Sequence, residues 1–120
     1  MEEKTCATCG RLIEWRKKWA DCWDEVKFCA DSCRRNKPGK IDRELEDTIL
    51  SLLHSRPSNF TICPSEAARA IFPAERWRDE MERTRRAARR LVATGKLQIL
   101  QKGKVVDPST AKGPIRLSKR

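Results

Sequence analysis

Apolar residues recur with helical spacing from residue 41 onward. The first such run falls at positions i, i+4, i+8, i+11 and i+12, and its members are Ile41, Leu45, Ile49, Leu52 and Leu53. This spacing predicts one apolar stripe along an amphipathic helix of about 14 residues. The polar run from Arg56 to Asn59 predicts where that helix ends.

Two further helices are expected after this one. Pro64 predicts the start of the second, because a proline in the first helical turn has no N–H group to leave unpaired. Pro73 ends that helix, and its expected buried residues are Ala67, Ala68, Ile71 and Phe72. A third helix is expected from about residue 74 to about residue 94, with Gly95 as its stop. One face of this third helix consists of Trp77, Met81, Thr84, Ala88 and Leu91.

Short extended segments separate and follow these helices. Residues 97–101 predict a strand, residues 102–104 a turn, and residues 113–117 the returning partner strand. Residues 61–63 fit a short strand or an extended lead-in to the second helix. Three helices followed by a two-stranded hairpin are the order of elements in a winged helix-turn-helix domain. We therefore predict such a domain, with the hairpin as its wing, over residues 41–120.

A polar break around Pro38-Gly39 separates this domain from a first module, residues 1–38. Three tryptophans of the first module recur every four positions, as Trp15, Trp19 and Trp23. A four-residue spacing keeps one face in a helix and also in a strand, so this periodicity does not choose between them. The expected fold class of the whole chain is α+β, with two modules.

Four cysteines form two close pairs in the first module, Cys6 with Cys9 and Cys29 with Cys33. Each close pair can hold one side of a metal ion, and two pairs complete a tetrahedral site that suits Zn²⁺. A segment shorter than roughly 40 residues usually needs a metal or disulfides to fold. We therefore expect one structural zinc ion in a treble-clef-like module, with a hairpin over residues 11–28 and a short helix that carries Cys33.

Disulfides and thiol-redox chemistry are the alternatives for these cysteines. The chain begins with a polar stretch and has no transmembrane run, so we expect a cytoplasmic protein without membrane contact, in which thiols stay reduced. A redox Cys-x-x-Cys pair typically opens a helix after a strand, whereas Gly10 after Cys9 is typical of a metal-binding knuckle. Cys22 falls outside the best-spaced quartet, and Cys63 is expected to be a buried or capping residue. No catalytic constellation stands out, and His54 is the only histidine, so we do not expect an enzyme.

The charge of the chain favours an anionic partner. The formal net charge is +10, and a zinc ion on four thiolates would lower it by only two. Nucleic acid is therefore the first expectation, with DNA ahead of RNA. The expected contacts are basic residues of the third helix and of the wing, namely Arg78, Arg85, Arg86, Arg89, Arg90, Lys102, Lys104 and Lys112. The alternative for the arginines is a solvated face neutralised by nearby carboxylates.

Basic and aromatic residues alternate between the two cysteine pairs. This stretch comprises Trp15, Arg16, Lys17, Lys18 and Trp19, and it could bind a strand by stacking and charge or contact a protein partner. The alternative is that these tryptophans form the small core of the module. Overall the sequence predicts a zinc-containing nucleic-acid-binding protein, a small DNA-binding regulator or accessory factor. A protein–protein adaptor and an RNA- or ribosome-associated factor stay open as alternatives.

Both halves also resemble bacterial families. Residues 6–35, with the pattern Cys6-Ala-Thr-Cys9-Gly, Trp15-Arg-Lys-Lys-Trp19 and Cys29-Ala-Asp-Ser-Cys33-Arg, resemble domain of unknown function 2256. Residues from about 42 to 118, with Cys63-Pro-Ser-Glu-Ala-Ala-Arg69, Trp77-Arg and Lys112-Gly-Pro-Ile-Arg116, resemble domain of unknown function 3253. The resemblance implies a zinc-finger-like module joined to a winged-helix-like one, and it implies no particular activity.

Overall fold

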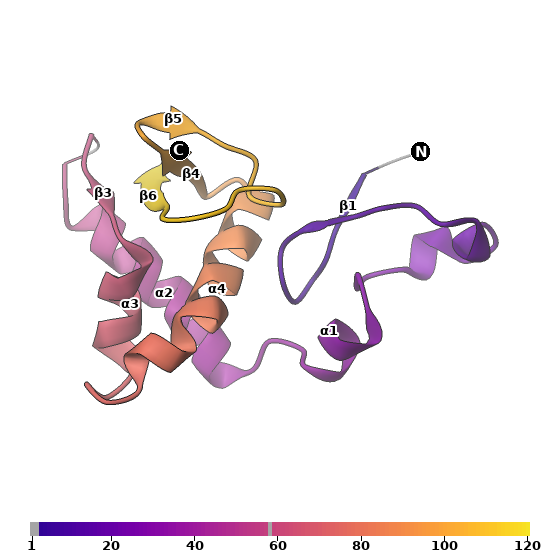
Figure 1. The fold of residues 1–120 in the computed structure, drawn as a ribbon, viewed down its shortest axis with the longest axis horizontal. Helices are drawn as coiled ribbons and strands as arrows, with labels where there is room; N and C mark the ends of the chain where they lie inside the picture. Colours follow the sequence, from indigo (N-terminus) through magenta and orange to yellow (C-terminus); the bar gives the residue numbers. More distant parts are fainter. Residues whose placement is uncertain (1–2, 58) are drawn as a thin grey trace.

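The larger part of the chain combines three helices with a four-stranded sheet (Figure 1). A computed structural model describes residues 3–57 and 59–120, and the fold is α+β. The helices are α2 (Lys40–His54), α3 (Pro64–Ile71) and α4 (Met81–Ala93), the last preceded by a short 3-10 helix, η3 (Trp77–Glu80). The strands are β3 (Thr61–Ile62), β4 (Leu97–Gln101), β5 (Lys104–Val105) and β6 (Arg116–Lys119). They lie in the order β3-β6-β4-β5, and every neighbouring pair is antiparallel.

The core of this part lies where the three helices meet the sheet. Its buried residues are Leu45, Ile49, Leu53, Ile62, Ala67, Ala68, Phe72, Ala87, Ala88, Leu91, Leu97, Ile99 and Leu117. The alanines of α3 and α4 in this core are fully buried, and such small side chains let packed helices approach closely. The apolar stripe predicted for α2 is buried at its centre, whereas Ile41 in the first turn is 39% exposed.

Most predicted elements are present, with shifted ends. The strand expected at residues 97–101 is β4, and the two residues after it, Lys102 (φ 51°) and Gly103 (φ 79°), form the tight turn to β5. The returning strand begins at Arg116 rather than at residue 113. Gly113 has a φ of 85° and the following proline has no N–H, so neither residue can join the ladder.

The first module departs from its prediction in the position of the hairpin. Strands β1 (Lys4–Thr5) and β2 (Leu12–Ile13) pair around the first cysteine pair, so the hairpin predicted over residues 11–28 is wrong. Two 3-10 turns, η1 (Lys17–Trp19) and η2 (Trp23–Glu25), occupy most of that segment instead. A short helix, α1 (Asp31–Arg35), then carries Cys33 as expected.

The first module lies against α4 on the side away from α3 (Figure 1). The chain passes from α1 into α2 at Pro38-Gly39, and Gly39 donates its N–H to the Asp42 carboxylate at 2.8 Å, which caps α2. Among the helices of the described ranges, none has the length and apolar character that crossing a lipid bilayer requires.

Candidate metal centre and its seat on helix α4

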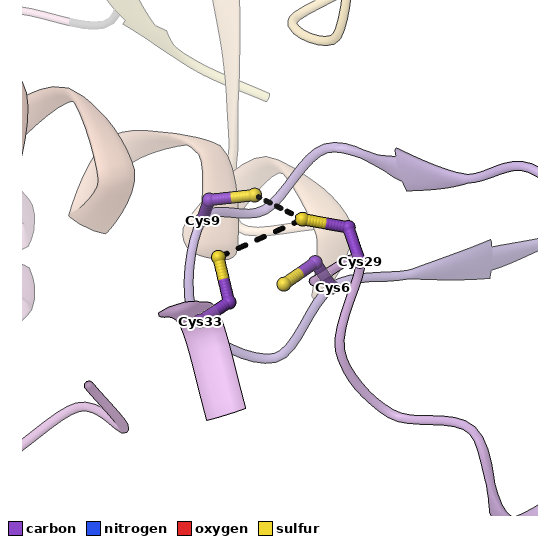
Figure 2. A group of neighbouring side chains, drawn as sticks. All are labelled: Cys6, Cys9, Cys29 and Cys33. Atoms are coloured by element: carbon purple, nitrogen blue, oxygen red, sulfur yellow. Dashed lines mark hydrogen bonds between the residues drawn. The ribbon is translucent and has the colours of Figure 1, made fainter. Parts of the chain in front are cut away.

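Four thiols converge at the end of the β1–β2 hairpin, as Figure 2 shows. The sulfur atoms of Cys6, Cys9, Cys29 and Cys33 all lie within 4.8 Å of one another. The Cys29 sulfur lies 3.7 Å from that of Cys9 and 3.6 Å from that of Cys33. Sulfurs placed tetrahedrally at about 2.3 Å from a metal ion are roughly 3.8 Å apart, whereas a disulfide requires about 2.05 Å. The spacing therefore fits a site that could hold one metal ion, and all six cysteines are unbridged.

The backbone around the first pair forms the knuckle expected from the sequence. The N–H of Gly10 donates to the Cys6 carbonyl at 3.0 Å, and the Cys6 N–H donates to the Arg11 carbonyl at 2.8 Å. Gly10 has a φ of 77°, a conformation that side chains disfavour. The Thr8 hydroxyl donates to the Cys33 carbonyl at 2.7 Å, which ties the knuckle to α1.

The four thiols affect one another's ionisation. Burial raises the pKa of Cys6, but hydrogen bonds from the backbone at Cys9, Cys29 and Thr8 outweigh it and bring that pKa to about 7. Burial raises the pKa of Cys29, and the neighbouring sulfurs of Cys33 and Cys9 raise it further. Burial also raises the pKa of Cys33. Four adjacent thiolates repel one another in the absence of a cation, and a divalent ion would supply the missing positive charge.

The other two cysteines lie away from the quartet. Cys63 precedes α3, where its N–H donates to the Glu66 carboxylate at 3.0 Å and its sulfur accepts from the Ser65 hydroxyl at 3.1 Å. This is the capping position expected from the sequence. Cys22 is half-buried between η1 and η2. His54 is exposed at the last residue of α2.

Two arginines of α4 bind the knuckle directly. The Nε–H of Arg89 donates to the Cys9 carbonyl, and an Nη of Arg90 donates to the Thr8 carbonyl at 2.7 Å. Other nitrogen atoms of the same two guanidinium groups pair with carboxylates. Arg89 lies 2.7 Å from Glu82, and Arg90 lies 3.0 Å from Glu46. Both arginines are buried, at 5% and 8% exposure. Buried arginines with this many partners act as a fixed seat for the first module.

The placement of Arg89 and Arg90 corrects their sequence-based assignment to a nucleic-acid surface. Their guanidinium groups already bind protein oxygens, so no face of either group is open to an external phosphate. Of the other predicted contacts, Arg78 is exposed, and Arg85 and Arg86 are half-buried. Arg86 lies 3.5 Å from Glu82, which also pairs with Arg89. The three predicted lysines, Lys102, Lys104 and Lys112, are all exposed.

Two acidic residues of α2, Asp42 and Glu46, complete the seat, and neither was predicted from the sequence. Asp42 lies 2.7 Å from Arg83, and Glu46, one helical turn later on α2, lies 3.0 Å from Arg90. The sequence contains a signal for this pairing. Asp42 and Glu46 are four residues apart and therefore lie on one face of α2, from which they can face two arginines on one face of a neighbouring helix. Burial raises the pKa of Glu82, but its hydrogen bond from Arg89 and the nearby charge of Arg11 outweigh burial and lower that pKa.

The aromatic and basic stretch between the cysteine pairs is partly packed and partly exposed. Trp19 is half-buried and stacks on Trp23, with ring centroids 6.0 Å apart. Trp15 is 37% exposed. Arg16 and Lys18 lie 5.9 and 5.2 Å from the centre of the Trp19 ring. Trp19 and Trp23 therefore contribute to the core of the module, as one alternative predicted, whereas Trp15 is not among the described residues packed against it.

Together these observations define a class: a small α+β protein in which a cluster of four cysteines, a candidate metal site, is seated on a helix of a larger helical and sheet part. The chain belongs to the family described as "Protein of unknown function (DUF3253)", whose family model matches residues 42–120. A second family model, described as "Uncharacterized protein conserved in bacteria (DUF2256)", matches residues 1–36. Both resemblances drawn from the sequence are thereby confirmed, in the predicted order. No curated protein matches the chain.

Loss of the Asp42 charge is expected to lower stability only above acidic pH. Burial raises the pKa of Asp42, but the Arg83 hydrogen bond and the Gly39 N–H outweigh it, so the folded pKa lies below the ordinary value of 3.8. A lowered folded pKa means that the carboxylate stabilises the fold above about pH 4 and that this contribution disappears as pH falls through the folded pKa. Asp42→Asn should cost about 1–3 kcal/mol of unfolding free energy at pH 7, and the cost should become smaller as the pH falls from 4 to 3.

Urea unfolding of Asp42→Asn and of the wild type from pH 7 to pH 3 measures the difference in their unfolding free energies. Any loss of metal caused by acid affects both proteins and cancels in that difference. Asp47→Asn is the matched control, because Asp47 is exposed on the same helix and forms no ion pair with any described residue. An unchanged loss at pH 7 and pH 3 would contradict the charge pairing.

Proposed function

We propose that the cysteine quartet holds one structural Zn²⁺ ion. Four thiolates at tetrahedral spacing suit zinc and leave no open coordination position for catalysis. The buried residues of the first module are few, and three of its four core members are ligand cysteines, Cys6, Cys9 and Cys33. A module with so little apolar core requires a cross-link, and the ion supplies it. The knuckle followed by a helix that carries the last ligand supports the treble-clef-like description.

We further propose that the larger part is a winged helix-turn-helix domain. Its support is the order of elements: three helices, a first strand between α2 and α3, and a hairpin that returns to pair with that strand through β6. In such domains the outward side of the third helix reads the DNA major groove. Here that side of α4 carries Arg86 and Arg89, and the knuckle lies on it at Gly10.

On this basis we propose a zinc-containing protein that binds nucleic acid through phosphates rather than through base edges in a groove. The observation that carries this proposal is the distribution of charge. Carboxylates near the arginines are already engaged in ion pairs, as Asp42, Glu46, Glu66, Glu80 and Glu82. Lys102, Lys104 and Lys112 are exposed and form no ion pair among the described residues. The excess charge of the chain is therefore presented to solvent, where it can bind an anionic polymer.

The first module covers the side of α4 that would enter a DNA groove, so DNA is no longer favoured over RNA. Phosphate contacts alone do not distinguish the two polymers. Competition among duplex DNA, single-stranded DNA and structured RNA at one salt concentration decides between a DNA-binding accessory factor and an RNA- or ribosome-associated one.

Alanine at Lys102, Lys104 and Lys112 is expected to weaken binding most at low salt. With about five phosphates engaged, log affinity should fall against log salt with a slope near −4, and removal of three contacts should reduce that slope by about 2.5. Fluorescence anisotropy of a labelled oligonucleotide from low to moderate salt measures both slopes. The arginine-substituted triple variant, which keeps the charge, is the control. Binding by the wild type that does not respond to salt would rule out the proposal.

A protein–protein adaptor is the second candidate, because the first module exposes apolar side chains close together in sequence. Leu12 is 41% exposed and Trp15 is 37% exposed. A partner recovered on the immobilised protein after nuclease treatment, and lost with Trp15→Ser, would favour this function over nucleic-acid binding.

A further inference from the structure

The segment between the cysteine pairs encloses a hollow that the metal centre does not use. It has a volume of about 550 Å³, within the usual range for small-ligand sites. The segment that carries most of its lining residues projects away from the sheet (Figure 1, right). Cys29 forms part of its wall, so the metal site would hold that wall in place.

The lining of the hollow combines positive charge with aromatic rings. Its basic residues are Arg16, Lys18, Lys27 and Arg34, and its aromatic residues are Trp19 and Phe28. Two carboxylates also line it, and one of them, Asp31, is paired with Arg34 at 2.7 Å. Glu25 is the other, so three cations face a single unpaired carboxylate. An anionic ligand is therefore favoured over a neutral or cationic one.

Trp19 is positioned to stack on a ligand. Its contact with Trp23 fixes its orientation from one side, at 6.0 Å between centroids. The cationic groups of Arg16 and Lys18 lie over the same ring, 5.9 and 5.2 Å from its centroid, so a base that stacks on Trp19 would displace them to positions where they can pair with its phosphates. Proteins hold unpaired bases without reading their sequence by combining an aromatic ring with nearby exposed cations, as Trp19, Arg16 and Lys18 do here.

From these contacts we propose that this hollow binds one unpaired nucleotide of a single-stranded nucleic acid. The base stacks on Trp19, and the adjacent phosphates bind Arg16, Lys18 and Lys27. This inference rests on the proposed nucleic-acid function. It assigns to the first module a preference for single strands, which the exposed lysines of the wing do not provide.

Two neighbouring lysines provide a matched test. Lys18 lines the hollow, whereas Lys17 is exposed and does not line it, and each change to alanine removes the same charge. Anisotropy with labelled oligo(dT) and oligo(U) of about ten nucleotides should show at least about fivefold weaker binding for Lys18→Ala and less than twofold for Lys17→Ala. Trp19→Leu should weaken binding about tenfold, and Trp19→Phe should retain most of it. A duplex of the same length should respond equally to the two lysine changes.

The outcomes separate the two proposals. If the wild type binds in a salt-dependent way but Lys18→Ala and Lys17→Ala behave alike, the hollow is not the site and the proposed function stands. If the wild type binds no oligonucleotide at low salt, both fall. Metal content is measured for each variant, and if Trp19→Leu loses metal the lysine pair alone decides. The oligo(dT) and oligo(U) arms show whether the ribose hydroxyl contributes.

Discussion

Replacing Cys33 with serine is expected to release the metal ion and unfold the first module. Cys33 is buried and its sulfur lies 3.6 Å from that of Cys29, so its loss opens one corner of the quartet. Structural zinc contributes apparent binding free energies of about 10–16 kcal/mol in small modules, which far exceeds what the few buried apolar groups here can supply. Metal analysis should fall from about one ion per chain to nearly none. The backbone signals of residues 3–36 should collapse in a heteronuclear NMR spectrum while the core around Leu45 and Leu91 stays folded.

Two cysteines outside the quartet are the controls for this substitution. Cys22→Ser and Cys63→Ser remove a thiol without touching the site, so both should keep the full metal content. Cys63→Ser also keeps a capping side chain at the start of α3. Equal metal loss in all three variants would mean that the metal is not held by the four clustered thiols, and a folded Cys33→Ser module without metal would contradict the structural role.

The elements that the sequence predicted well are those specified by local patterns. The stripe through Leu45, Ile49 and Leu53 requires a helix to be buried, and alternation in residues 97–101 requires a strand. The clustering of Cys6, Cys9, Cys29 and Cys33 was equally predictable, because two close cysteine pairs are typical of a shared site. Each of these inferences depends on residues near one another in sequence.

The features that were missed depend on contacts between distant segments. A run of arginines looks the same whether it faces phosphates or protein carbonyls, and only the fold shows that Arg89 and Arg90 bind residues about 80 positions earlier. The hairpin was placed in the wrong segment for a related reason. Tryptophans every four residues do not distinguish strand from helix, and here they mark successive 3-10 turns in which Trp19 and Trp23 stack.

Part of the basic charge of α4 binds the protein itself, because Arg89 and Arg90 donate to carbonyls of the first module. Arg89 and Arg90 hold the first module in position, and that module in turn covers one side of α4. The two families matched in this chain therefore form one physical unit through α4. Any partner must bind the composite surface or one of the parts that projects from it.

Gly10→Ala is expected to break this unit without touching a metal ligand. A Cβ atom on Gly10 would lie 2.6 Å from the carbonyl carbon of Arg89 and 2.8 Å from the backbone nitrogen of Arg90, far inside normal contact. Backbone atoms of a packed helix cannot shift cheaply, so the knuckle must move away. The positive φ of Gly10 adds about 1–2 kcal/mol. We expect a total loss of about 3–5 kcal/mol in urea unfolding, with metal retained, together with faster hydrogen exchange in the knuckle.

Gly113→Ala is the control that separates the two costs. Gly113 has a φ of 85°, and a Cβ there would meet nothing within 4 Å, so this variant carries the backbone strain without the overlap. It should lose only about 1–2 kcal/mol. The difference between the variants therefore measures the close packing of the knuckle on α4. Equal losses, or a Gly10→Ala protein in which Arg89 and Arg90 stay protected, would show that the seat is looser than the described contacts require.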